Sequence, residues 1–215
     1  MRSKLARIPS VCQLEVDVST RAEQREQTRA TLLRESRRLF AGQGYAAVGL
    51  AEIVAAAGVT KGALYHHFAG KAELFRAVLD QVQQEVAARV VAAADAEKEP
   101  WDQLVTGCQA FLTASTDPLL QRIMLVDGPA VLGWAQWRKL DTDNSARHLG
   151  EALTGLVELG VIARQPVEPL THLLSGAMNE AALWLAAAGG PRDLADTQAA
   201  LARLLDSLRA QAVDA

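Results

Sequence analysis

The stretch from Leu50 to Phe68 constrains the fold of this chain more than any other part of the sequence. Its first apolar residues recur at helical spacing on one side of a short helix: Leu50, Ile53, Val54 and Ala57. Gly58 then interrupts the pattern and accepts the positive φ that a tight turn needs. Thr60 is a suitable N-cap for a second short helix that runs to His67. Two helices joined so closely predict a helix-turn-helix.

The remainder of the chain also favours helices. Half of the 215 residues are apolar (50%), which is enough for a substantial core. Helix-forming residues dominate, and no sustained run alternates with period two. We therefore expect an all-α fold, with the helix-turn-helix in an N-terminal three-helix head and a C-terminal helical bundle. The expected helices are 20–40, 50–57, 60–67, one from 71 onward, 101–115, 118–131, 134–159, 167–188 and 191–211.

Charge divides the chain in the same way. The formal net charge is −3, yet residues 1–80 contain twelve Lys and Arg against eight Asp and Glu. We expect residues 1–19 to form a disordered arm, residues 20–80 the head, and residues 81–215 the larger helical body. A basic head on an acidic body favours contact between the head and a polyanion.

Other features restrict the compartment and the chemistry. Cys12 and Cys108 lie far apart, as is typical of a protein from a reducing compartment. The sequence shows neither a signal-peptide pattern nor an apolar run long enough to span a bilayer. We therefore expect a cytoplasmic protein without a membrane partner. No nucleophile, phosphate-loop or zinc signature stands out, so we expect no catalytic residues, no cofactor and no metal.

Three segments resemble the DNA-binding signature of the TetR family of transcriptional regulators. They read FAGQGY at 40–45, EIVAAAGVTKGALYHHF at 52–68 and KAEL at 71–74. Spacing and identity match across three successive helices, whereas the body matches only in general layout. The resemblance implies a homodimeric repressor whose head binds palindromic operator DNA and whose larger helical domain binds a small hydrophobic inducer.

The same resemblance implies which residues meet DNA. Base contacts belong to the first residues of the second motif helix, and phosphate contacts to its later residues and the start of the next helix. The expected DNA-binding residues are Thr60, Lys61, Gly62, Ala63, Tyr65, His66 and Lys71. A lysine can donate to guanine and a tyrosine to a phosphate oxygen, which fits these roles. Val48-Gly49 departs from the Thr-Ser that is usual in the family, so one phosphate contact is in doubt.

Several basic residues allow two interpretations. Adjacent His66 and His67 suit a DNA-proximal or structural role better than a metal site, because neighbouring helical residues diverge by about 100°. Three arginines at i+4 spacing are more typical of a solvated helix face than of phosphate contacts: Arg21, Arg25 and Arg29. A disordered start is favoured over a minor-groove arm for Arg2, Lys4 and Arg7.

Aromatic and soft side chains in the body are candidates for an inducer cavity, with ordinary core packing as the alternative for each. The ligand-binding candidates are Phe111, Met124, Trp134, Trp137, His148, Met178 and Asn179. Such a cavity suits an uncharged or weakly charged aromatic or hydrophobic compound. If Arg122 or His148 pointed inward, an anion would be preferred instead.

The last two predicted helices are expected to pair with those of a second copy as a four-helix bundle. On the helix 167–188, residues about 100° apart divide into two faces. We expect the partner to meet the face of Leu174, Met178, Ala181 and Leu185, and the cavity to meet the face of His172, Ser175 and Asn179. Three alternatives stay open: a body that only dimerises, an activator, or a helical enzyme with an appended head.

Overall fold

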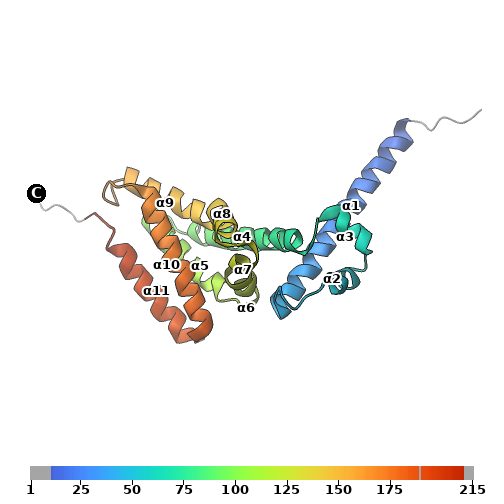
Figure 1. Cartoon of the computed structure of the whole chain (residues 1–215). Coiled ribbons are helices and arrows are strands. Elements are labelled where there is room, and N and C mark those ends of the chain that lie inside the picture. Colours follow the sequence, from blue (N-terminus) through green and yellow to red (C-terminus); the bar gives the residue numbers. More distant parts are fainter. Residues whose placement is uncertain (1–10, 189, 211–215) are drawn as a thin grey trace, which may run out of the picture.

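The computed structural model describes residues 11–188 and 190–210, without the side chains of 11–20, 188 and 191. Within these ranges the elements are helices, and the one β-type pairing is an isolated antiparallel bridge between Ile162 and Arg209 (Figure 1). The predicted all-α fold is therefore confirmed. Residues 1–10, with the three basic residues near the N-terminus, lie outside the described residues.

The head consists of α1 (Val11–Gln43), α2 (Leu50–Ala57) and α3 (Lys61–His67). Gly58 adopts φ 65° and ends α2, and the Thr60 hydroxyl accepts a hydrogen bond from the Ala63 amide at 3.1 Å as the N-cap of α3. Both features are as predicted.

The first helix begins nine residues earlier than predicted, which corrects the expectation of an arm for residues 11–19. Pro9 is the last proline before Pro100, and Gly42 is the first glycine, so no helix-breaking residue lies between them.

α4 (Lys71–Ala94) joins the head to the body and runs unbroken through the expected domain boundary at residue 80 (Figure 1). Its predicted apolar stripe is completely buried: Leu74, Phe75, Val78, Leu79 and Val82. One continuous hydrophobic core follows this stripe from the head into the body. Because α4 contributes to both parts of the molecule, the head and the body share this core.

The body is built from shorter pieces than predicted. Two expected long helices, 118–131 and 134–159, are each interrupted by a π-helical segment, and the last helix ends at Asp206 rather than at 211. Gly133, at φ 76°, separates the two groups of helices. In order, the elements are α5 (Pro100–Ser115), α6 (Pro118–Gln121), η1 (Arg122–Asp127), α7 (Gly128–Leu132), α8 (Trp134–Asp141), η2 (Thr142–Ala146), α9 (Arg147–Glu158), α10 (Val167–Ala188) and α11 (Pro191–Asp206).

Of the two faces predicted for α10, the one with Ser175 and Asn179 is turned inward as expected, but the predicted partner face is wrong. The face expected to meet a partner is turned into the protomer's own core, with Leu174 and Met178 only 4% and 6% exposed. The outer surface instead presents Leu173 and Trp184, which are 72% and 52% exposed. The physical reason is that the helix has apolar residues on more than one side, so periodicity alone does not say which side meets α5 and α9.

Candidate functional site

The second motif helix, α3, has one buried and one exposed side. Leu64 and the C-cap residue Phe68 are buried and hold α3 against the head. The predicted base-facing and phosphate-facing side chains lie mainly on the exposed side, among them Lys61, and Tyr65 is 48% exposed. The head therefore presents the amino-terminal half of a short helix to solvent, which is the element that enters a major groove in helix-turn-helix proteins.

Two of the predicted DNA-binding lysines are supported by aromatic rings. The Lys61 ammonium lies 5.9 Å from the centre of the Tyr65 ring, and the Lys71 ammonium lies 4.1 Å from the centre of the Tyr45 ring. A cation over a ring face is attracted by the ring electrons, and this restricts where the charge lies. Both lysines keep an ammonium near the surface, where phosphates or base edges can be reached.

A basic hollow of about 440 Å³ lies between α1 and α3. It is lined by Arg21, Gln24, Arg25, Thr28, Ala63, His66 and His67. Burial lowers the pKa of His67, and the charges of Arg25 and Arg29 lower it further. Arg29 itself lies 5.6 Å from the Phe68 ring centre, so this member of the arginine stripe packs on the head. The hollow collects positive charge beside α3, which suits a phosphate better than a metal ion.

The body contains an apolar cavity of about 80 Å³ between α4, α5, η2, α9 and α10. Most of its wall is hydrocarbon or sulfur: Val90, Val91, Ala94, Leu104, Cys108, Phe111, Leu149, Ala152 and Met178. Burial raises the pKa of the Cys108 thiol to about 12. Pockets for drug-sized ligands measure about 300–1,000 Å³, so in this conformation the cavity fits only a small molecule.

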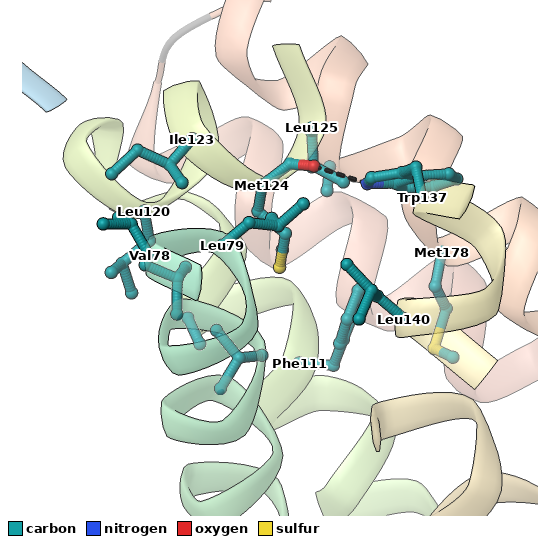
Figure 2. Packing of buried hydrophobic residues seen from close by; sticks show 14 of the residues in the cluster. Val78, Leu79, Phe111, Leu120, Ile123, Met124, Leu125, Trp137, Leu140 and Met178 are labelled. Carbon is teal, nitrogen blue, oxygen red and sulfur yellow. Dashed lines mark hydrogen bonds between the residues drawn. The ribbon is translucent and has the colours of Figure 1, made fainter. Parts of the chain in front are cut away.

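The predicted ligand-binding residues separate into three groups. Phe111, His148 and Met178 line the apolar cavity. Trp134, Trp137 and Asn179 instead line a groove of about 450 Å³ between α8 and α10, with Arg138 and His172. Met124 lines neither hollow. Figure 2 shows why: its side chain lies among Leu79 and other core residues, and its carbonyl accepts a 2.7 Å hydrogen bond from the Trp137 indole.

A polar cluster separates the cavity from the outer groove. Asp141 is 5% exposed, and its Oδ2 accepts hydrogen bonds from Arg138 Nη1 at 2.5 Å and from Ser175 Oγ at 3.2 Å. Burial raises the pKa of Asp141, while Arg138 and the hydrogen bonds oppose that rise. Asn179 lies close enough to contribute, but neither of its amide atoms makes a hydrogen bond within the described residues.

The body contacts the head through the π-helical segment η1. Asp127 Oδ2 accepts a hydrogen bond from the Tyr45 amide at 2.8 Å, and Arg122 Nη1 donates to the Gly42 carbonyl at 2.9 Å. We name these two hydrogen bonds the head–body latch. Trp137 of α8 binds the Met124 carbonyl in the same segment. A continuous set of contacts therefore connects the wall of the cavity with the loop that precedes the helix-turn-helix.

The sequence does not predict the roles that Asp141, Arg122 and Asp127 have in the structure. An acid in an apolar helix stripe was the available signal for Asp141, which follows Trp137 and Leu140. Arg122 and Asp127 stand out as polar residues in an apolar segment, which suggests ligand contact, but their partners are backbone groups of the head eighty or more residues away. Within the described ranges, no cluster of three metal-binding side chains occurs, and no helix is long and apolar enough to cross a membrane.

Two family models match the two parts of the chain. The model described as bacterial regulatory proteins of the tetR family matches residues 32–78, and the model described as the tetracyclin repressor-like C-terminal domain matches residues 101–208. A solved TetR-family transcriptional regulator from Pectobacterium atrosepticum is 37% identical, with a TM-score of 0.72 over 88% of this chain and 97% of that one.

Curated relatives agree with the family models. The Tn10 TetC protein of Escherichia coli is 27% identical over 149 residues, which span 69% of this chain and 75% of TetC. The HTH-type transcriptional regulator TtgR of Pseudomonas putida is 44% identical over 62 residues, only 29% of this chain and 30% of TtgR. TtgR is a transcriptional regulator by name, and regulators of this family are not enzymes. The exposed recognition helix, the matching N-terminal and C-terminal models and the shared all-α fold lead to one conclusion: the chain belongs to the TetR family of DNA-binding transcriptional regulators.

Proposed function

We propose that this protein is a cytoplasmic, homodimeric repressor that binds a palindromic operator and releases it when a small hydrophobic inducer enters the body. One observation carries the proposal: the apolar cavity lies in a body that is hydrogen-bonded directly to the DNA-binding head. A body that served only for dimerisation would need neither an apolar void nor a latch to the head.

The proposed reading of DNA assigns different tasks to neighbouring side chains. Lys61, at the first turn of α3, is proposed to contact a base edge, while Tyr65, His66 and Lys71 contact phosphates. The Thr60 hydroxyl accepts the hydrogen bond that caps α3, so we propose that Thr60 contacts a base through its methyl group. Gly62 and Ala63 add little bulk and let the helix lie close to the groove.

The proposed dimer uses the outer face of α10 together with α11. This face presents an apolar stripe at helical spacing: Leu173, Gly176, Ala177, Leu183 and Trp184. Figure 1 shows α10 and α11 side by side at the end of the molecule opposite the head. Large exposed apolar stripes are unusual on monomers, and small residues within this one allow two helices to approach closely.

In the proposed mechanism, the inducer shifts a population between two arrangements of body and head. A ligand in the cavity presses on η2 and α8, and Trp137 transmits the displacement to η1. The latch then holds the two heads at a different separation, in which both no longer fit successive major grooves. The size of the effect equals the difference in ligand affinity between the two arrangements.

Selection of bound sequences from random DNA tests the proposal. We expect an inverted repeat whose half-sites lie about one helical turn, or a simple multiple, apart. A bound site without dyad symmetry would contradict the homodimer. A panel of small apolar compounds then tests operator release, and failure of every compound would favour a ligand-independent regulator. A reporter assay with the selected site separates repression from activation.

A charge placed in the proposed interface tests the dimer separately. Ala177→Glu introduces like charges that face each other across a symmetric contact, so we expect a monomer in sedimentation and loss of operator binding. Ala88→Glu, on the exposed side of α4, is the matched control and is expected to remain a dimer. A dimeric Ala177→Glu variant would move the interface elsewhere.

A further inference from the structure

The wall of the apolar cavity contains one acidic residue and no lysine or arginine among the residues that the structure describes. The acidic residue is Asp141. The other polar lining residues are Gln103, Ser145, His148 and Ser175. An anionic ligand would therefore meet a carboxylate without a facing cation.

The two oxygens of Asp141 have different surroundings. Oδ2 accepts hydrogen bonds from Arg138 and from Ser175. Oδ1 accepts no such hydrogen bond within the described ranges, and Asp141 lines the cavity, with the Asn179 side chain close enough to lower the pKa of its carboxyl. A carboxylate oxygen in a cavity wall that lacks a full hydrogen bond is strengthened by a ligand that supplies a donor.

The charge of Asp141 is already balanced. Arg138 binds the same carboxylate from the side of the outer groove, where its guanidinium also lies 3.2 Å from His172 Nδ1. An ammonium ligand would add a net positive charge to a cavity with mostly apolar walls, which is unfavourable. A neutral hydroxyl donates the hydrogen bond without that cost.

The histidine of the cavity does not change this preference. His148 Nδ1 lies 3.4 Å from Glu151 Oε2, and its Nε2 lies 3.3 Å from Arg147 Nη2. Both ring nitrogens thus have partners among residues that do not line the cavity, so His148 presents its ring carbons to a ligand there. The sequence-based option of an anion held by an inward Arg122 also loses its basis, because that guanidinium binds the Gly42 carbonyl.

We infer that the inducer is a small, neutral, apolar molecule with one hydroxyl group, and that Asp141 Oδ1 accepts the hydrogen bond from that hydroxyl. The inference rests on the proposed function, because it concerns the ligand of the same cavity. It adds the chemical class of that ligand and the residue that distinguishes it from similar apolar compounds.

Direct binding of matched probes to the full-length protein, without DNA, tests the inference. In isothermal titration calorimetry we expect phenol to bind about ten- to a hundredfold more tightly than anisole, which has the same ring without the donor. The pair of 2-naphthol and 2-methoxynaphthalene extends the comparison to a larger ring. Benzylamine and benzoate, which carry opposite charges, are expected to bind more weakly than phenol.

A double substitution locates the hydrogen bond. Arg138→Met with Asp141→Leu replaces the buried ion pair by apolar groups, a change that proteins often tolerate. We expect this variant to bind phenol and anisole equally. The matched control is Lys139→Met with Asp143→Leu, which removes the neighbouring exposed ion pair and is expected to keep the preference for phenol.

Three results would overturn the inference: equal binding of phenol and anisole by the wild-type protein, tighter binding of either charged probe, or no binding of phenol. The wild-type comparison decides the ligand class even if the double variant fails to fold. None of these results depends on operator binding, because the ligand assays contain no DNA and the DNA selection measures operator binding separately. A failed ligand class and a failed regulator function are thus distinguishable.

Discussion

Gly128 lies where a single added methyl group tests the packing between η1 and α8. A Cβ at this position would come within 2.8 Å of Trp137 Cδ1 and 3.1 Å of the Ile123 carbonyl oxygen. Real Cβ atoms do not approach another carbon so closely, and Trp137 is only 3% exposed, so the indole has little room to withdraw. Gly128→Ala therefore forces either the indole or the π-helical segment to move.

Two effects of Gly128→Ala lower the free energy of unfolding, and one effect raises it. Overpacking a dense core costs about 1–3 kcal/mol. Displacing the indole weakens its hydrogen bond to the Met124 carbonyl, and an unsatisfied buried carbonyl costs about 1–3 kcal/mol. Alanine is favoured over glycine in a helix by about 1 kcal/mol. The net expectation is a loss of about 3 kcal/mol in the free energy of unfolding.

Gly155→Ala is the matched control for Gly128→Ala. Gly155 lies within α9, and a Cβ there meets no described atom within 4 Å. The same substitution is therefore expected to stabilise the protein by about 0.5–1 kcal/mol, because it only reduces the freedom of the unfolded chain. One substitution type thus has opposite signs at two helical glycines.

Urea unfolding followed by far-ultraviolet circular dichroism, at one fixed protein concentration, measures both free energies. A double-mutant cycle with Trp137→Phe isolates the cause, since a smaller ring relieves the contact and Gly128→Ala then costs less. An unchanged or more stable Gly128→Ala variant would refute the packing argument. An additive cycle would show that the indole is not the group displaced.

The remaining predictions concern the head, the latch and the cavity. Lys61→Ala is expected to cost about 1–3 kcal/mol of operator binding and to relax preference at one base pair per half-site, whereas Tyr65→Phe weakens all sequences alike; selection from random DNA compares them. Asp127→Ala removes the acceptor of the Tyr45 amide, so hydrogen exchange at Tyr45 is expected to accelerate at least about tenfold, and a protected amide would contradict the latch. Cys108, with its pKa raised to about 12, is about one part in 10⁵ thiolate at pH 7, so maleimide labelling is expected only on unfolding; rapid labelling of the native protein would contradict its burial.

The helices of the head could be predicted because their ends depend on local chemistry. Gly58 ends α2 by adopting a positive φ, and Thr60 begins α3 by accepting the Ala63 amide, and both are properties of single residues. The stripe on α4 was equally accessible, because one side of that helix is apolar at every turn. The start of α1 does not follow from hydrophobic periodicity, because residues 11–19 show no helical period. The absence of glycine and proline between Pro9 and Gly42 is the signal that agrees with the longer helix.

The π-helical segments could not be predicted in the same way. A π-helical turn shares the composition of the α-helix around it and has no residue signature of its own. In η1, whose backbone hydrogen bonds span one residue more than those of an α-helix, the Met124 carbonyl accepts a hydrogen bond from the indole of Trp137, thirteen residues away. In η2, Asn144 has non-helical angles, and its side chain donates to the Leu140 carbonyl at 2.8 Å. Such features depend on tertiary contacts that a sequence window does not contain.

The orientation of α10 could not be predicted from hydrophobic periodicity, because this helix has apolar residues on more than one side. Leucines at 173 and 174 lie on neighbouring sides of the helix, yet one is almost fully exposed and the other almost fully buried. A hydrophobic pattern reports that a side chain avoids water, without reporting whether its own chain or a second copy provides the cover. Buried polar residues indicate which side of α10 faces the protomer core, because a buried hydroxyl needs a hydrogen-bond partner. Ser175 donates its hydroxyl to Asp141 of the same protomer. Since Leu174 and Met178 flank Ser175 on that side, the opposite side of α10 is the one that the proposed dimer uses.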